Sequence, residues 1–190
     1  EGRRPIAVGN LPYQIASPLL FRLLEARAGI ARIVVMLQAE MAQRIVAAPG
    51  TPEYGALTVM VRMVGEPKIL HKVPPGAFFP PPRVSSAVLR IEPIATARFP
   101  ITDDGWFSDV VHAAFGQRRK TLRNALRTVA APEPIASALA ATGIDEQRRG
   151  ETLDLAAFAA LAEALLRATG GKRLPKGTVP PTSPKSGRDG

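Results

Sequence analysis

Residues 5–13 read Pro5-Ile6-Ala7-Val8-Gly9-Asn10-Leu11-Pro12-Tyr13, an apolar run followed by a glycine and a polar, proline-containing loop. The run predicts a buried β-strand, because it is short, apolar and bounded by turn residues. In an open α/β sheet, ligands bind in the crevice at the carboxyl ends of the strands. We therefore expect a binding site in the loop that follows this strand.

Strands and helices alternate through the rest of the first half. Ser17 predicts a helix N-cap with Pro18 at the first helical position, and Gly29 predicts the end of that helix. The uninterrupted apolar run Ile33–Leu37 predicts a strand buried on both faces. Further helices are expected over residues 39–48 and 55–64, and further strands over residues 67–73 and 85–91. Such alternation predicts a mostly parallel α/β sheet.

The second half shows only helical periodicity. Helices are expected over residues 103–115, 121–129 and 134–142, and a fourth is expected after Asp154, with Leu155, Phe158, Ala162 and Leu165 in one stripe. We therefore predict a partial α/β domain over residues 1–93 and a small all-α domain over residues 94–170. Residues 171–190 are rich in Pro, Gly, Ser and Lys and predict a disordered basic tail.

Composition excludes several classes of protein. The 190 residues include no cysteine, which rules out disulfides, a thiolate nucleophile and cysteine zinc sites, and with two histidines no metal site is expected. A net charge of +9 favours a polyanionic partner, either nucleic acid or an anionic membrane. Neither a signal peptide nor an apolar run of about 18 residues is present, so we expect a cytoplasmic protein. Because the first residue is Glu1 and a strand follows almost at once, we expect the chain to be the downstream part of a longer protein.

The loop after the first strand has a chemistry of its own. Asn10 offers a side-chain carbonyl as an acceptor, and Leu11 precedes a proline, which holds its backbone extended and aims its carbonyl. Tyr13 adds a flat ring. Two fixed acceptors beside an aromatic ring suit a planar amine such as the exocyclic amine of adenine. The alternative is a plain strand-to-helix turn with a core tyrosine.

A proline-rich segment over residues 74–84 is the second candidate. Its three consecutive prolines, Pro80 to Pro82, hold the chain stiff and extended. Such stiffness would present Phe78 or Phe79 as a fixed aromatic surface facing a pocket. The alternative is a rigid connector whose phenylalanines cover the core.

A basic segment over residues 117–127 is the third candidate. It carries Arg118, Arg119, Lys120, Arg123 and Arg127 and no acid. On a helix, three of these cations would share one face. Their mutual repulsion is uncompensated within the segment, which favours binding to phosphates over the alternative of a solvated helix face.

Together these segments resemble the rRNA adenine N6,N6-dimethyltransferase family, and within it the bacterial small-subunit branch. The resemblance runs from about residue 5 to about residue 166. The matching blocks are Gly9 to Tyr13, Leu37 to Glu40 with Gln43-Arg44, Tyr54-Gly55, Val73 to Pro75 with Ala77-Phe78, Pro80 to Val84 with Ser86 to Val88, and Ala114 to Thr121. The block at residues 117–124 resembles the small-subunit branch more than the large-subunit, antibiotic-resistance branch.

The resemblance implies the C-terminal half of a Rossmann-like class I methyltransferase sheet followed by a small all-α domain. It implies S-adenosylmethionine as methyl donor, adjacent adenosines near the 3′ end of small-subunit rRNA as substrate, and a monomer that acts on the pre-30S particle in ribosome biogenesis. The family's target-amine loop maps onto Asn10, Leu11, Pro12 and Tyr13, and its asparagine also contacts the cofactor. The family's stacking phenylalanine maps onto Phe78 rather than Phe79. In the same reading, Arg118, Arg119, Lys120 and Arg123 bind rRNA phosphates.

One departure from the family keeps other readings open. The chain has no GxGxG-type segment, and the family builds its cofactor site mainly from such glycine-rich and acidic motifs upstream of the loop. We therefore expect this chain alone to be inactive. The alternatives are a non-catalytic RNA-binding or ribosome-assembly module, a dimethyltransferase for large-subunit rRNA and, last, a peripheral membrane protein.

Overall fold

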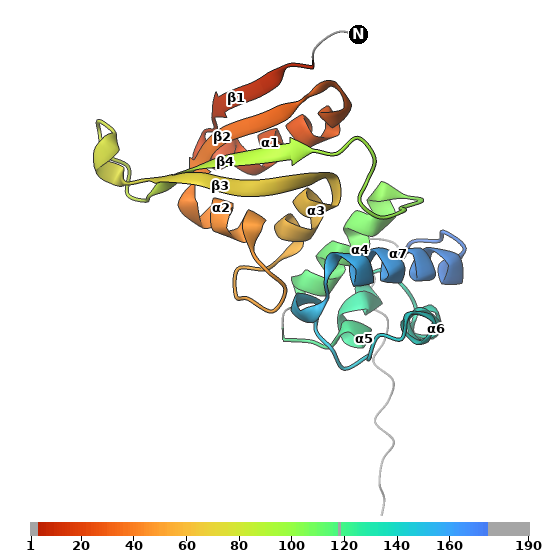
Figure 1. Cartoon of the computed structure of the whole chain (residues 1–190). Coiled ribbons are helices and arrows are strands. Elements are labelled where there is room, and N and C mark those ends of the chain that lie inside the picture. The colour runs from red at the N-terminus through yellow and green to blue at the C-terminus, as the bar shows by residue number, and fades with distance from the viewer. Residues whose placement is uncertain (1–3, 118, 175–190) are drawn as a thin grey trace, which may run out of the picture.

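The computed structural model describes residues 4–117 and 119–174, so residues 175–190 of the tail predicted over residues 171–190 lie outside it. A four-stranded sheet with the order β1-β2-β4-β3 forms one side of the molecule (Figure 1). Its strands are β1 (Ile6–Asn10), β2 (Arg32–Gln38), β3 (Gly65–Val73) and β4 (Ser86–Pro93). Strands β1 and β2 are parallel, whereas β4 is antiparallel to both β2 and β3. The expectation of a mostly parallel sheet is therefore wrong for the described strands. No crossover helix separates β3 from β4, and a parallel pair needs one.

Three helices cover one face of this sheet: α1 (Ala16–Glu25), α2 (Ala39–Val46) and α3 (Ala56–Val64). They pack against Ile33, Val35 and Leu37, which alternate along β2 and are fully buried. Between them, Val34 and Met36 point to the other face and are only partly buried. Burial on both faces, expected for this strand, is therefore not seen in the part of the chain that the structure describes.

The second half is helical throughout, as predicted: α4 (Asp104–Gly116), α5 (Leu122–Ala125), α6 (Pro132–Thr142) and α7 (Leu155–Thr169). The Asp154 side chain caps α7 by accepting a hydrogen bond from the N–H of Ala157 at 2.8 Å, as predicted. Two predicted helices differ from expectation. A 3-10 turn over residues 13–15 leads directly into α1, so Ser17 lies inside its first turn. The helix expected over residues 121–129 is split into α5 and a 3-10 turn over residues 126–128.

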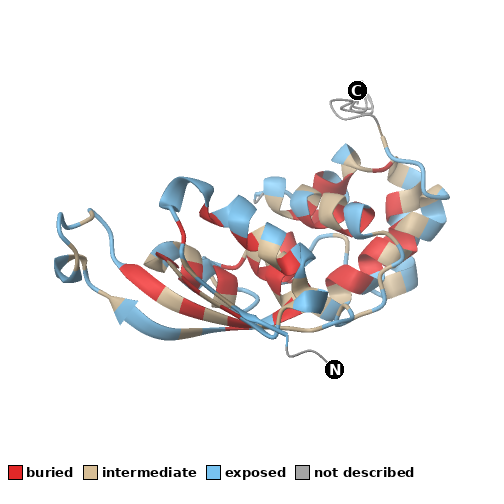
Figure 2. Ribbon diagram, turned by 90° about the horizontal axis from the view of Figure 1, so that it is seen from above, coloured by how far each residue is buried: buried red, intermediate tan, exposed pale blue. Residues whose placement is uncertain are grey.

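Helix α3 belongs to two apolar cores at once. Its Val61 packs in the core beneath the sheet, while its Val59 and Met63 pack in the core of the helical half. Figure 2 shows buried residues both in the sheet layer and in the helices of the second half. The predicted domain boundary at residue 93 stays a prediction, since α3 precedes it in the chain and is part of both cores.

Tyr54, just before α3, fixes the same junction. Its hydroxyl donates a hydrogen bond to the carbonyl of Leu153 at 2.8 Å, and its ring lies edge-on to Phe115 at 5.6 Å between centroids. Burial, followed by the negative charge of Asp154, raises the pKa of Tyr54 to about 12. Tyr54 thus adds a buried hydrogen bond and a ring contact to the junction between the sheet half and the helical half.

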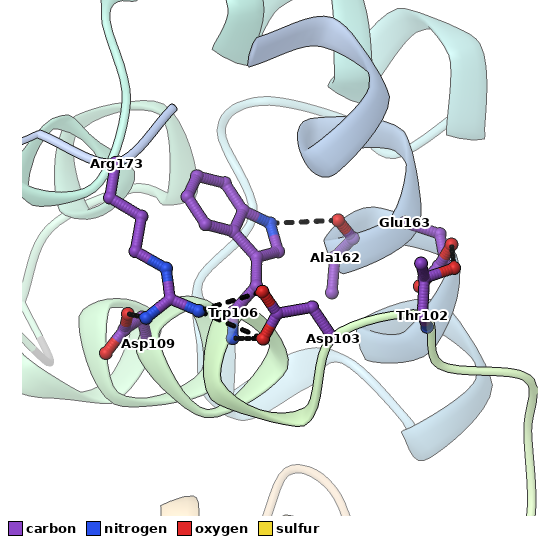
Figure 3. A network of polar contacts seen from close by, with 7 residues as sticks. All are labelled: Thr102, Asp103, Trp106, Asp109, Ala162, Glu163 and Arg173. Atoms are coloured by element: carbon purple, nitrogen blue, oxygen red, sulfur yellow. Dashed lines mark hydrogen bonds and ion pairs between the residues drawn. The ribbon is translucent and has the colours of Figure 1, made fainter. Parts of the chain in front are cut away.

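A polar network ties the end of α7 to the start of α4 (Figure 3). Asp103 caps α4 by accepting a hydrogen bond from the N–H of Trp106 at 2.8 Å, and this bond together with the nearby Arg173 guanidinium lowers the pKa of Asp103. The indole N–H of Trp106 donates to the carbonyl of Ala162 at 3.1 Å. Arg173 contacts Asp103 at 2.9 Å and Asp109 at 3.3 Å. The segment after α7 is therefore held against α4.

The Tyr54→Phe substitution tests the junction between the halves. It leaves the buried Leu153 carbonyl without this donor, so we expect the free energy of unfolding of the full-length protein to fall by about 1–2 kcal/mol. Above pH 10 the unfolded chain ionises this tyrosine while the folded chain does not, so wild-type stability declines as the pH rises from 10 towards 12. Urea unfolding at pH 8 and at pH 11 should show that the free energy of unfolding falls less in the variant than in the wild type between these two pH values. An equal fall in both proteins contradicts the raised pKa of Tyr54.

Candidate active site

The sheet topology brings two distant segments to one edge. Asn10, at the end of β1, pairs with Met36 near the end of β2. Because β4 runs antiparallel to β2, its first residue, Ser86, pairs with Gln38. The loop that leaves β1 and the segment that enters β4 therefore meet at the same end of the sheet, visible in Figure 1 where the β3–β4 connection extends from it.

A pocket of about 370 Å³ lies where these segments meet. It is lined by Asn10, Leu11, Pro12, Tyr13, Met36, Phe78, Phe79, Pro80 and Pro82. The structure thus places the first two candidate segments around one cavity. All five residues assigned to the target amine or its stacking, Asn10 to Tyr13 and Phe78, are among the lining residues.

Backbone hydrogen bonds fix the loop after β1. The N–H of Leu11 donates to the carbonyl of Met36 at 2.9 Å, which extends the β1–β2 pairing by one residue. The Leu11 side chain is buried beneath the loop, while Asn10 and Pro12 are exposed. The carbonyl of Pro12 accepts from the N–H of Ile15 at 3.1 Å, closing the turn into α1. The Asn10 amide is thus presented to the pocket from a loop tied down on both sides.

Tyr13 is held by a residue to which the sequence analysis gave no role. Its hydroxyl lies 2.7 Å from the hydroxyl of Ser86, which is fully buried at the start of β4. The Tyr13 ring remains 37% exposed, so it is not the core tyrosine of the alternative reading. A serine directly before the apolar run over residues 87–89 was the only sequence signal for this contact. Met36 was also missed, because nothing in a buried strand marks the residue that faces a pocket.

The two phenylalanines of the proline-rich segment differ in exposure. Phe78 follows a 3-10 turn over residues 75–77 and is partly buried where it lines the pocket. Phe79 lines the mouth of the same pocket and is 99% exposed. The alternative in which both rings cover the core is therefore wrong for Phe79.

The basic segment over residues 117–127 does not form the helical face of cations that its sequence predicts. Arg118 lies outside the described residues, and Arg119 and Lys120 are exposed in the turn between α4 and α5. Arg123 forms an ion pair with Glu146, with nitrogen–oxygen distances of 2.8 and 2.9 Å. The charge of Arg123 is thus compensated by an acid from a distant part of the sequence. Since α5 begins only at Leu122, the expected single helical face of cations does not form.

Metal ligands and membrane spans are both lacking within residues 4–117 and 119–174. In these ranges, no group of three or more His, Asp or Glu side chains is arranged to hold a metal ion. Over the same part of the chain, no helix has the length and apolarity needed to cross a bilayer.

Comparisons with known proteins find similar sequences over most of the chain. A family model described as ribosomal RNA adenine dimethylase matches residues 1–166. A protein named ribosomal RNA small subunit methyltransferase A from Anaeromyxobacter sp. (strain K) is 47% identical over 169 residues, which are 87% of this chain and 58% of that protein. A protein of the same name from Pelotomaculum thermopropionicum is 45% identical over 172 residues, which are 89% of this chain and 58% of that protein. The chain therefore spans 58% of the length of these curated relatives.

Two solved structures share the fold. A dimethyladenosine transferase from Plasmodium falciparum superposes with a TM-score of 0.77 at 22% identity, over 88% of this chain and 69% of that chain. The 23S rRNA methyltransferase ErmE superposes with a TM-score of 0.59 at 24% identity, over 87% of this chain and 67% of that chain. The α/β methyltransferase fold predicted from the sequence is thereby confirmed, although its sheet is mixed rather than mostly parallel.

A double-mutant cycle on Tyr13 and Ser86 tests the geometry of the pocket. If their hydrogen bond holds the ring, Tyr13→Phe and Ser86→Ala each lower the free energy of unfolding, and the double variant loses less than their sum by about 0.5–1.5 kcal/mol. Urea unfolding of the full-length protein measures all four corners of the cycle. Ser86→Ala combined with Tyr54→Phe is the control, because these residues share no contact and their effects should add. Additive effects for Tyr13 and Ser86 refute the contact.

Proposed function

The chain belongs to the ribosomal RNA adenine dimethylase family, and we propose that the full-length protein dimethylates the N6 amines of adjacent adenosines near the 3′ end of small-subunit rRNA. The observation that carries this proposal is the pocket that gathers the Asn10–Tyr13 loop and Phe78. The names of the relatives support the choice of the small subunit.

The loop after β1 supplies the acceptors for the target amine. The adenine amine is a poor nucleophile, because its lone pair is delocalised into the ring. In the first transfer, hydrogen bonds from its two N–H groups to the Asn10 side-chain oxygen and the Leu11 carbonyl draw those hydrogens aside and direct the lone pair out of the ring plane. In the second transfer the one remaining N–H donates to one of these two acceptors. The same acceptors stabilise the positive charge that develops on nitrogen. Fixing them before the substrate arrives removes part of the entropic barrier.

The aromatic residues of the pocket hold the base. A target adenine must leave its stack before it reaches the pocket, which costs a few kcal/mol. Stacking between Tyr13 and Phe78 offsets this by about 1–3 kcal/mol for each aromatic contact. The hydrogen bond between Tyr13 and Ser86 keeps the tyrosine ring in place before the base enters.

S-adenosylmethionine, when bound, supplies the electrophilic methyl group. Of the residues described, Asn10 fits a cofactor contact, since its side chain is exposed at the carboxyl end of β1, where open α/β sheets bind ligands. The proton released by the amine passes to water in this proposal, because among the residues that the structure describes no carboxylate or histidine lines the pocket.

The basic turn between α4 and α5 binds rRNA phosphates in this proposal. Arg119 and Lys120 are exposed there, and Arg118 adjoins them in the sequence. Such contacts set the register of the RNA without reading its bases. We further propose that the protein acts as a monomer on the pre-30S particle, in the cytoplasm, during ribosome biogenesis.

The Asn10→Ala substitution in the full-length protein tests the mechanism. Removing a fixed hydrogen-bond partner of the reacting group is expected to lower kcat by about 10²–10³ or more while the affinity for rRNA changes little. Single-turnover methylation and equilibrium RNA binding measure the two quantities separately. Gln14→Ala is the matched control, because it removes an exposed amide that does not line the pocket.

The choice of substrate is tested with the same protein. Small-subunit and large-subunit rRNA are offered side by side, and methylation of the small-subunit RNA alone is expected. Methylation of the large-subunit RNA instead supports the other branch of the family. Binding without methylation of either RNA supports the non-catalytic module, and an Asn10→Ala variant that loses affinity but keeps turnover contradicts the role of the loop.

The salt dependence of RNA binding tests the basic turn. Replacing Arg119 and Lys120 by glutamine is expected to reduce the slope of log K against log salt by about 0.7–0.9 for each phosphate that is no longer neutralised. Arg123→Gln should reduce it less, because Glu146 already pairs with that charge. Arg22→Gln on α1, where Glu25 pairs with the arginine, is the control. An unchanged slope in the double variant moves the phosphate site elsewhere.

A further inference from the structure

The connection between β3 and β4 projects beyond the end of the sheet (Figure 1). We call residues 70–85 of this projection the arm. The arm begins at the edge of the pocket, since Phe78, Phe79, Pro80 and Pro82 belong to both. A ligand in the pocket therefore lies beside the arm.

The arm carries positive charge and contains no acid. Residues 70–85 hold Lys72 and Arg83 but no Asp or Glu. Lys72 and Arg83 are exposed, and neither forms an ion pair with any residue that the structure describes. An uncompensated positive surface of this kind attracts a polyanion.

The arm also exposes apolar side chains. Phe79 is 99% exposed at the mouth of the pocket, and Leu70 and Val84 are 46% and 43% exposed. Phe78, its neighbour, lines the same pocket and is partly buried. One ring thus faces inward at the position proposed for the target base, and the next ring stands outside with its surface uncovered.

We propose that the arm is a second RNA contact in which Phe79 stacks on the nucleotide next to the flipped adenosine. The inference rests on the proposed function, since it takes the pocket to be the site of the target base. Removing a base from a strand uncovers the faces of its neighbours, and an exposed aromatic ring at the pocket mouth covers one of them. Lys72 and Arg83 neutralise the adjoining phosphates. Aromatic rings interleaved with unpaired cations are the usual means of holding single-stranded nucleic acid.

The test compares Phe79→Ala and Phe79→Trp in the full-length protein. The probe is a hairpin RNA with the 3′-terminal small-subunit sequence, carrying 2-aminopurine next to the target adenosine. Stacking of this strength predicts about a tenfold loss of RNA affinity in Phe79→Ala and recovery in Phe79→Trp. Stacking also quenches the probe in the wild type and in Phe79→Trp but not in Phe79→Ala. Leu19→Ala, which removes another exposed apolar side chain outside the arm, should change neither quantity.

The outcomes separate this inference from the proposed function. Unchanged affinity and quenching in Phe79→Ala overturn the inference and leave the proposed function standing if methylation is also unchanged. A loss seen with the pre-30S particle but not with the hairpin overturns it in favour of a protein contact. If the wild-type protein methylates no rRNA but still quenches the probe through Phe79, the arm contact is supported and the proposed function is overturned. Thermal unfolding of both variants should match the wild type, because the side chain is exposed.

Discussion

The antiparallel pairing of β4 with β2 is the constraint on which the pocket depends. It puts the first residue of β4 beside the last residue of β2, while the parallel pairing of β1 with β2 brings the end of β1 to the same place. A parallel β4 would begin at the opposite end of the strands. The proline-rich segment would then enter the sheet far from the Asn10–Tyr13 loop. The hydrogen bond between Tyr13 and Ser86 spans 73 residues of sequence and is a direct result of this topology.

The path of the backbone therefore determines most of the geometry of the pocket. The loop is fixed by main-chain hydrogen bonds from Leu11 and Ile15, and the opposite wall is a stretch of prolines with few donors. No ionisable group is required to hold the acceptors in position. This suits a reaction in which the protein's part is to orient an amine and stabilise a developing charge.

Local patterns in the sequence were sufficient for most elements but not for pairings between distant ones. The stripe of α7 and its Asp154 cap were predictable, because both depend on residues three or four positions apart. The resemblance to a family brought Asn10 and Phe78 to one site before any geometry was known. The direction of β4, the role of Ser86 and the pairing of Arg123 with Glu146 were not predictable, since each joins segments at least 23 residues apart. Which acid neutralises a given cation depends on the folded surface. It cannot be read from a run of cations in the sequence.

Helix α3 has a consequence for how the protein meets a large ligand. Because Val61 packs in the core beneath the sheet while Val59 and Met63 pack in the core of the helices, hinge opening between the halves would uncover apolar side chains that are now buried. Exposing these apolar side chains to water is unfavourable. The distance between the pocket and the α4–α5 turn therefore stays constant. In the proposed complex with rRNA, the change of shape on binding would then fall on the nucleic acid rather than on the protein.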